Sequence, residues 1–286
     1  MPLIFEQLVN GLVLGAMLCL ISVGLSLILG LMRVVNLAHA ALFAVGAYLG
    51  LTVHSVTQSF LLGIFCSFAG GVILGIILEI GFIRLVYEDP DASLILTFGL
   101  LLAITEIIKM IWGPAPQLPK IPEELFGNIV IGPAVLPIYR VVVAGLGILI
   151  FAAIYLLIKK TAAGLVTRAV LDNRSLVESF GIKTAITLRS VFALASGVAA
   201  LSGYLAGPMF GIFPDTGMSP LLFSFIAVIL GGVGNIFGTA VASILIGLIM
   251  SFATLIAPSL GYVIVYSFSI AVLLYRPQGL FVKTEA

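Results

Sequence analysis

The sequence predicts an all-α protein, a polytopic bundle of about eight or nine transmembrane helices that occupies residues 1–286 as a single domain. Hydrophobic residues make up 62% of the chain and charged residues 9%, whereas soluble domains carry about 45–50% and about 25%. Apolar runs of about 18 or more residues recur along the chain, and each can cross ~30 Å of hydrocarbon. The runs are continuous and do not alternate at period two, which favours helices over strands.

Each expected span is an apolar run that ends at charged or turn-forming residues. The spans cover residues 9–31, 36–54, 60–83, 92–112, 138–158 and 190–205, with three further passages within 221–275. The sequence GGVGN at 231–235 and Pro258 interrupt the last stretch, so one passage there could be a re-entrant half-helix. The N-terminus lacks the basic region and cleavage site of a signal peptide, so the first run should remain as a span.

Two connections are too polar or too broken to span. Residues 113–137 are rich in proline, and residues 159–189 form the longest polar segment, with small residues, mixed charges and a helix-like rhythm. Gly181 is well placed to end a short helix in this second segment. The segment could be a solvated connector or a docking element for a cytoplasmic partner, and both interpretations remain open. An apolar stripe on it would consist of Leu165, Ala169, Leu176 and Phe180.

The distribution of basic residues predicts the orientation. Threading the chain alternately through the membrane leaves three of the thirteen Lys and Arg residues, namely Lys109, Lys120 and Arg140, on one side. Because Lys and Arg accumulate on the cytoplasmic side, the side with the other ten should be cytoplasmic, together with the C-terminus. Nine passages would place the N-terminus outside. The ten residues are Arg33, Arg84, Lys159, Lys160, Arg168, Arg174, Lys183, Arg189, Arg276 and Lys283.

Glycine pairs spaced four residues apart predict how the helices pack. In lipid there is no hydrophobic drive between helices, so close backbone contact through small residues is the main source of association. Tight helix packing is therefore favoured over a ligand role for these pairs. They are Gly11/Gly15, Gly46/Gly50, Gly71/Gly75, Gly203/Gly207 and Gly234/Gly238.

The sequence lacks the residues that several functional classes require. No P-loop motif is present, so nucleotide phosphates would have to bind elsewhere. Two histidines, His39 and His54, and two cysteines, Cys19 and Cys66, cannot build a histidine-based metal cluster or a disulfide framework. No Ser/His/Asp set suggests a hydrolase, and no basic patch with interleaved aromatics suggests nucleic-acid binding. We expect a transport protein that is not an enzyme and holds no metal.

Four stretches, in the right order, resemble the LivH-type permease subunits of branched-chain amino acid ATP-binding-cassette importers. They are GLSLILGLMRVVNLAHAALFAVGAYLG at 24–50, the GLVTRAV…ESFGI region of 164–182, VILGGVGNIFGTAVASILIGL at 228–248, and RPQGLF at 276–281. The resemblance covers nearly the whole chain. It implies a multi-pass protein of the bacterial inner membrane that works as one subunit of a heteromeric importer.

The resemblance also implies the partners and a site for them. They would be a LivM-like second permease, two cytoplasmic ATPases that bind ATP and Mg²⁺, and a periplasmic solute-binding protein. Residues 159–189 would be the coupling loop that seats on one ATPase, with Gly164, Arg168, Asp172 and Gly181 at the matching positions. Closure of the ATPases would then tilt the helices between outward and inward openings.

The resemblance does not fix the solute. Ala40 stands where the family usually has glycine after the Ala-His pair, and DNRSLVESF replaces a more alanine-rich stretch of the loop. The expected cargo is branched-chain or related amino acids, with urea, amides or aromatic acids as alternatives on the same scaffold.

Six residues are candidates for the translocation path, each with a simpler structural role. Asn36 and His39 could hydrogen-bond a neighbouring helix or sit on an unwound segment that lines the path. Gly231, Gly232 and Asn235 could form a tight turn or line the path.

Glu106 could form an interfacial pair with Lys109 at i, i+3, or serve a solute or proton relay in an autonomous ion-coupled carrier. Glu79 is most simply a partner for Arg84. A membrane scaffold without a transport role is the third alternative.

Overall fold

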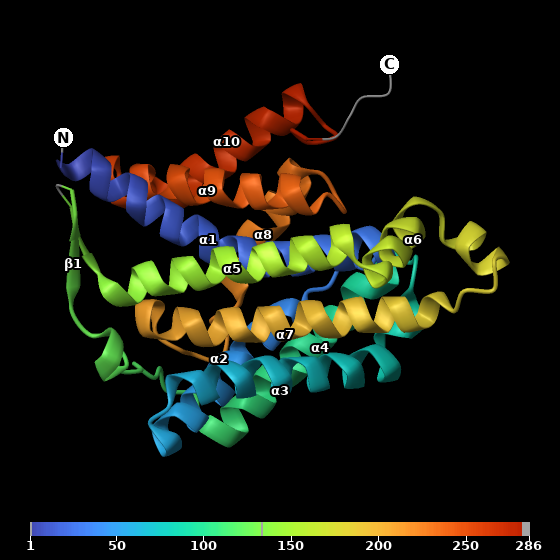
Figure 1. Cartoon of the computed structure of the whole chain (residues 1–286), viewed down its shortest axis with the longest axis horizontal. Helices are drawn as coiled ribbons and strands as arrows, with labels where there is room; N and C mark the ends of the chain where they lie inside the picture. Colours follow the sequence, from blue (N-terminus) through green and yellow to red (C-terminus); the bar gives the residue numbers. More distant parts are fainter. Residues whose placement is uncertain (1, 133, 282–286) are drawn as a thin grey trace.

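The computed structural model describes residues 2–132 and 134–281, and these residues form a bundle of long helices with one short hairpin (Figure 1). The expected all-α membrane architecture is confirmed. Lys283 lies outside the described residues. The helices are α1 (Pro2–Met32), α2 (Ala38–Thr57), α3 (Phe60–Gly81), α4 (Pro90–Trp112), α5 (Ile138–Lys160), α6 (Ala162–Ser179), α7 (Thr184–Phe210), α8 (Met218–Gly231), α9 (Ile236–Ile256) and α10 (Gly261–Tyr275), and the strands are β1 (Asn128–Ile131) and β2 (Ala134–Pro137).

Eight helical segments within the described residues are long and apolar enough to cross a membrane. Helix α8 has 14 residues, which at 1.5 Å per residue reach only ~21 Å, less than the ~30 Å of a hydrocarbon core. It is the half-length passage that the sequence allowed in 221–275. The expected count of eight or nine passages is therefore confirmed: α8 is the shorter apolar helix beside the eight, and α10 reaches 18 residues together with the 3₁₀ turn before it.

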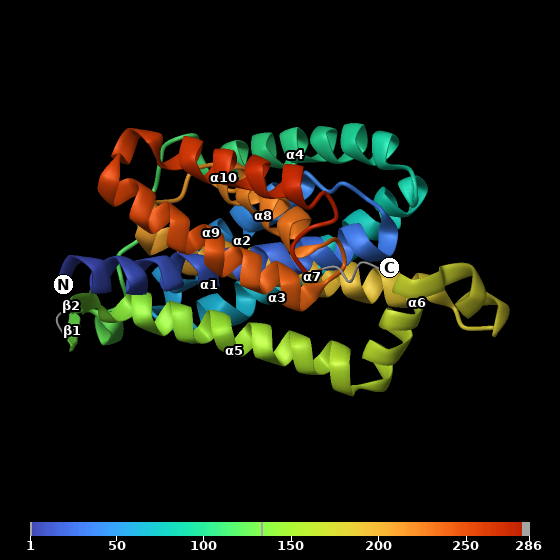
Figure 2. The same cartoon turned by 90° about the horizontal axis from the view of Figure 1, so that it is seen from above.

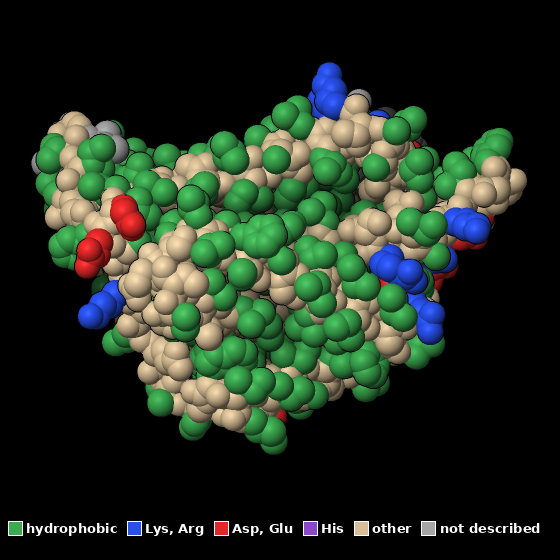
Figure 3. Space-filling model, turned by 60° about the horizontal axis from the view of Figure 1, so that its bottom comes forward, with side chains coloured by type: hydrophobic (Ala, Val, Ile, Leu, Met, Phe, Trp, Pro, Cys, Tyr) green, Lys and Arg blue, Asp and Glu red, His purple; other side chains and the backbone are tan. Residues whose placement is uncertain are grey.

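The bundle has two distinct ends. The β1–β2 hairpin and the N-terminus mark one end, called the hairpin end, and α6 protrudes from the other, called the α6 end (Figures 1 and 2). Charged side chains gather at these two ends, and hydrophobic side chains cover the band between them (Figure 3). Large apolar residues such as Ile95, Phe98 and Ile148 are exposed on that band, as expected when lipid is the solvent.

Helices α1 and α7 form the centre of the bundle. Leu25 and Ile28 of α1 and Phe192 and Ala199 of α7 are completely buried. Small residues allow the other helices to approach: Cβ atoms added at Gly11 or Gly15 would collide with the backbone of α9. Likewise, glycines 71 and 75 of α3 meet α7 at residues 193–200. The expected role in helix packing is confirmed for Gly11/Gly15 and Gly71/Gly75. Gly234 of the Gly234/Gly238 pair lies instead in the α8–α9 connection, with φ 78°.

The elements α1–α4 and α7–α10 repeat the same order in opposite directions. Helix α1 starts at the hairpin end, whereas α7 starts at the α6 end, directly after α6 (Figure 1). A non-helical segment precedes both α2 and α8. A 3₁₀ turn joins α3 to α4 (Ile83–Val86) and another joins α9 to α10 (Pro258–Leu260). The protein is therefore an inverted repeat, with α5 and α6 as the connection between its halves.

The sequence misplaced the start of the sixth span. It expected residues 159–189 to lie outside the membrane helices, but α7 begins at Thr184 and carries Arg189 in its second turn. Arg189 donates to Glu79 Oε2 at 2.7 Å, so its charge is neutralised by α3. The expected pairing of Glu79 with Arg84 is wrong for the same reason. Arg84 was expected because it is close to Glu79 in the sequence, whereas the residue that pairs with Glu79 in the fold is 110 residues away.

Candidate functional site

The second membrane passage is broken at its start. Residues 33–36 are not helical, and α2 begins only at Ala38. The His39 Nε2 atom lies 3.2 Å from the carbonyl oxygen of Ile21, which is eleven residues before the end of α1. At 1.5 Å per residue, Ile21 lies ~16 Å from the end of α1. The segment after α1 therefore returns alongside that helix to about half the depth of a bilayer core before α2 begins. The helix start expected near Asn36 is thus found two residues later, at Ala38.

Two hydroxyl groups of α4 satisfy the backbone of this unwound segment. Ser93 Oγ accepts a hydrogen bond from Val35 N at 3.0 Å. Thr97 Oγ1 accepts from Leu37 N at 3.0 Å and donates to the Val35 carbonyl oxygen at 2.9 Å. Non-helical backbone at membrane depth is tolerated only where such partners exist. Sequence analysis missed both residues, although their i, i+4 spacing on one face of α4 was a usable signal.

Asn36 and His39 lie together at this break, and both are completely buried. The contact from His39 to α1 is of the kind expected for the simpler of the two roles considered for that residue. Both polar atoms of the Asn36 amide and the Nδ1 atom of His39 have no hydrogen-bond partner among the described residues. Because buried polar groups are normally paired, the break is a polar centre with unused hydrogen-bonding capacity.

Helix α8 starts at the same depth as α2. Gly217, the residue before α8, packs on the backbone of Ala40, and a Cβ atom there would overlap the Ala40 carbonyl oxygen. A cavity of about 430 Å³ lies beside the start of α8, on the side of the hairpin end. Its walls are mostly apolar and come from α1, α2, α7, α8, α9 and α10. Residues that line it include Phe43, Thr216, Ser219, Phe223, Met250 and Tyr262.

The other candidates for the path lie away from this centre. Gly231, Gly232 and Asn235 form the tight connection from α8 to α9 at the α6 end, where Gly232 has φ 92°. Asn235 Oδ1 caps α9 by accepting from Gly238 N at 2.9 Å. Glu106 lies on the exposed surface of α4. Among the described residues that line the cavity, none of the six candidates occurs, and of the six only Asn36 and His39 lie at the broken start of α2.

We expect the Glu106→Gln substitution to leave uptake unchanged. Glu106 is exposed and pairs with Lys109 at 2.7 Å, and an exposed pair contributes only about 0–1 kcal/mol. The measurement is solute uptake by cells that contain equal amounts of the wild-type or variant protein. Loss of uptake at normal protein level would instead give Glu106 a role in transport.

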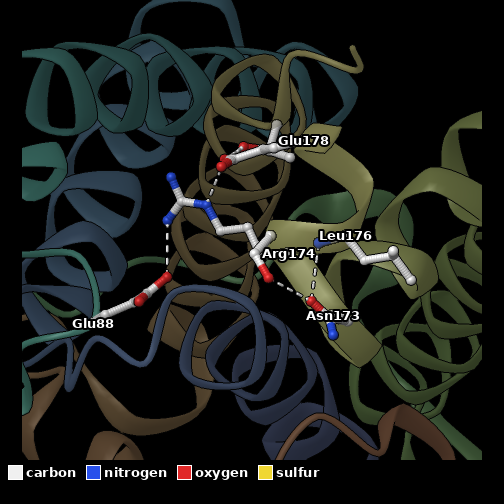
Figure 4. Close-up of polar contacts among 7 residues, drawn as sticks. Glu88, Asn173, Arg174, Leu176 and Glu178 are labelled. Carbon is white, nitrogen blue, oxygen red and sulfur yellow. Dashed lines mark hydrogen bonds and ion pairs between the residues drawn. The ribbon is translucent and has the colours of Figure 1, made fainter. Parts of the chain in front are cut away.

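The expected coupling loop is folded as two short helices separated by a kink. Helix α6 spans Ala162–Ser179, but Asn173 has φ −158° and ψ 98°, which breaks the helix there. Asn173 Oδ1 accepts from Leu176 N at 3.0 Å and so caps the second piece (Figure 4). The helix ends as predicted before Gly181, which has φ 78°. Residues 173–182 are called the α6 tip.

The four residues expected in the loop divide between its base and its tip. Gly164 is buried against the Leu157 and Ile158 carbonyl groups, and Arg168 donates a hydrogen bond to the Ile158 carbonyl oxygen. These two residues attach α6 to the end of α5. Asp172 is exposed next to the kink, and Gly181 is exposed within the tip. The tip also exposes two large apolar side chains that the sequence assigned to its stripe, Leu176 and Phe180.

An inverted repeat with two helices that start at mid-depth beside a cavity defines a polytopic membrane protein of the transport class. Residues 7–273 match the family described as "Branched-chain amino acid transport system / permease component". The chain belongs to this family, and the expected resemblance is confirmed.

Relatives match over nearly the whole chain. BraD of Pseudomonas aeruginosa, a high-affinity branched-chain amino acid transport system permease protein, is 25% identical over 98% of this chain and 96% of its own length. LivH of Escherichia coli, with the same description, is 22% identical over 98% of this chain and 96% of its own length. A probable LivH of Methanocaldococcus jannaschii is 27% identical over 92% of this chain and 88% of its own length. No solved structure shows a significant match.

Proposed function

We propose that residues 1–286 form one permease domain of an ATP-binding-cassette importer for branched-chain or related amino acids. Two features of the same bundle carry the proposal. One is the broken-helix centre, which is the unwound segment and start of α2 at residues 33–39 with the cavity beside α8, and the other is the protruding, partly apolar α6 tip at one end. The first feature is suited to solute passage, and the second is suited to contact with a separate ATPase subunit. The partners would be a second permease, two ATPases and a periplasmic solute-binding protein.

The α6 end would face the cytoplasm of a bacterial inner membrane, with the C-terminus on the same side. Nine basic residues of the described chain belong to connections or helix ends at the α6 end, from Arg33 to Arg276. Lys109, Lys120 and Arg140 belong to the hairpin end. This bias supports the orientation, because cytoplasmic loops carry the excess of Lys and Arg.

The lining of the cavity supports a solute with an apolar side chain. Phe43, Phe223 and Met250 offer contact area to an aliphatic or aromatic group, and hydroxyl-bearing residues such as Thr216, Ser219 and Tyr262 belong to the same lining. The exposed Glu106–Lys109 pair lies outside the cavity and gives no support to a proton-coupled carrier.

Purification of the tagged chain from native membranes tests this proposal. We expect a second permease and two ATPases to copurify, and the solute-binding protein of the same system to bind an aliphatic amino acid in calorimetry. A chain that purifies alone under conditions that preserve other importers would contradict the proposal. A binding protein selective for urea would contradict the assignment of the solute only.

A further inference from the structure

A cluster of charged side chains connects the α6 tip to the link between α3 and α4. Arg174, the first residue after the kink, donates from Nε to Glu178 Oε1 at 3.0 Å. Its Nη1 atom donates to Glu88 Oε1 at 3.2 Å, across 86 residues of sequence (Figure 4). The guanidinium carbon lies 5.6 Å from the centre of the Tyr87 ring, within the range of a cation–π contact.

A second set of contacts lies directly beside the first. Glu79 at the end of α3 is almost completely buried, and it accepts hydrogen bonds from Tyr87 Oη at 2.6 Å and Arg189 Nε at 2.7 Å. Tyr87 therefore contacts both Arg174 and Glu79. The seven residues that form this connected set are called the clamp: Glu79, Tyr87, Glu88, Arg174, Glu178, Thr184 and Arg189.

The contacts of the clamp fix the position of the α6 tip relative to the α3–α4 link more than they stabilise the fold. Glu178 accepts from the Thr184 hydroxyl and from Arg174, and these contacts hold the pKa of its carboxyl below the usual 4.5. Glu178 is therefore ionised at neutral pH. Glu88 has a left-handed backbone with φ 65°, and its N–H donates to the Met32 carbonyl oxygen at 3.0 Å. Exposed ion pairs stabilise a fold weakly, but a guanidinium fork fixes two carboxylates in one arrangement.

The clamp leads to the broken-helix centre through contacts that follow one another. Glu88 precedes Asp89, whose Oδ1 accepts from Ala92 N at 3.0 Å and caps the start of α4. The first turn of α4 then presents Ser93, which holds Val35 of the unwound segment. A displacement of the tip would thus reach the start of α2 through α4.

We propose that Arg174 is a positioning residue that fixes the α6 tip to the α3–α4 link, so that the two move as one body when an ATPase displaces the tip. This inference rests on the proposed function. It assigns α4 as an element that carries motion from the ATPase to the broken start of α2.

The first test compares Arg174 variants of the complete transporter in proteoliposomes. R174A should hydrolyse ATP at close to the wild-type rate but transport about three- to thirtyfold less solute per ATP, the range expected for residues along a coupled network. K109A, which breaks an exposed pair at the other end, should behave as wild type. An unchanged ratio in R174A would overturn the proposal.

The second test replaces the ion pair by a covalent link. In a background of C19A and C66A, the variant E88C/R174C should be uncoupled like R174A. A short bifunctional thiol reagent that joins the two cysteines should restore uptake, because tip and link then move together again. If the joined protein hydrolyses ATP and does not transport, the two parts must move apart during the cycle, and the proposal is wrong.

The two tests separate this inference from the proposed function. Formation of the cross-link in membranes without ATPases reports the clamp geometry alone. If it forms and the wild-type complex shows no ATP-driven uptake, the proposed function fails. If uptake is ATP-driven and the cross-link does not form, the proposed contact of Arg174 with Glu88 is contradicted and the proposed function stands.

Discussion

Replacing Phe180 with aspartate is expected to abolish the association of the permease with its ATPases while leaving the helical bundle folded. Phe180 is 76% exposed at the end of the α6 tip, so the fold loses little packing when it is removed. Buried aromatic anchors in interfaces contribute about 2 kcal/mol or more, and a charge in such a contact adds a desolvation cost. The amount of ATPase that copurifies should therefore fall by at least about thirtyfold.

Phe126 provides a matched control for this substitution. It is 77% exposed and lies in the connection before β1, at the hairpin end. Phe126→Asp introduces the same chemical change at the opposite end of the protein and should leave the ATPases bound. Retention of the ATPases by the Phe180 variant, at the same level as in the Phe126 variant, would remove the α6 tip from the docking surface.

Replacing Gly203 with alanine is expected to destabilise the protein strongly. Gly203 lies at the contact of α7 with α2, and a Cβ atom there would overlap the carbonyl oxygen of Phe43. A backbone carbonyl in a helix cannot move aside as the end of a side chain can. Overpacking costs about 1–3 kcal/mol and occasionally more, so the temperature of unfolding in detergent should fall by several degrees.

Gly99→Ala is the control, because a Cβ atom at Gly99 in α4 meets nothing within 4 Å. Alanine is favoured over glycine in helices by up to about 1 kcal/mol, so this variant should be as stable as wild type or slightly more stable. Equal unfolding temperatures for the two variants would mean that α2 and α7 are not in the contact described.

The spans were predictable because lipid requires continuous apolar helices, and each such helix is visible as an apolar run in the local sequence. The break before α2 was only half predictable for the opposite reason. Val34 and Val35 fall between two expected spans, but nothing local indicates that the chain runs back to mid-depth there, and the non-helical backbone around Val35 depends on Ser93 and Thr97 of α4. A stabilising partner about 60 residues away leaves no local signature. The β1–β2 hairpin within 113–137 was likewise unexpected.

The candidate site shows the same limit. Asn36 and His39 were found from their polarity in an apolar setting, and the structure brings them together. The cavity, however, is lined by Phe43, Phe223 and Met250, which are ordinary apolar residues in the sequence. Arg174 was one of several basic residues of the loop, and only its distances to Glu88 and Glu178 distinguish it.

Uptake by sealed liposomes tests the central claim most directly. The chain, a second permease and two ATPases would be reconstituted with the solute-binding protein outside and ATP inside, and aliphatic amino acid accumulation would be measured. Accumulation is predicted only when ATP and the ATPases are present. If this chain alone moves the amino acid at the same rate without them, it needs no external motor, and its role as a subunit of an ATP-driven importer is contradicted.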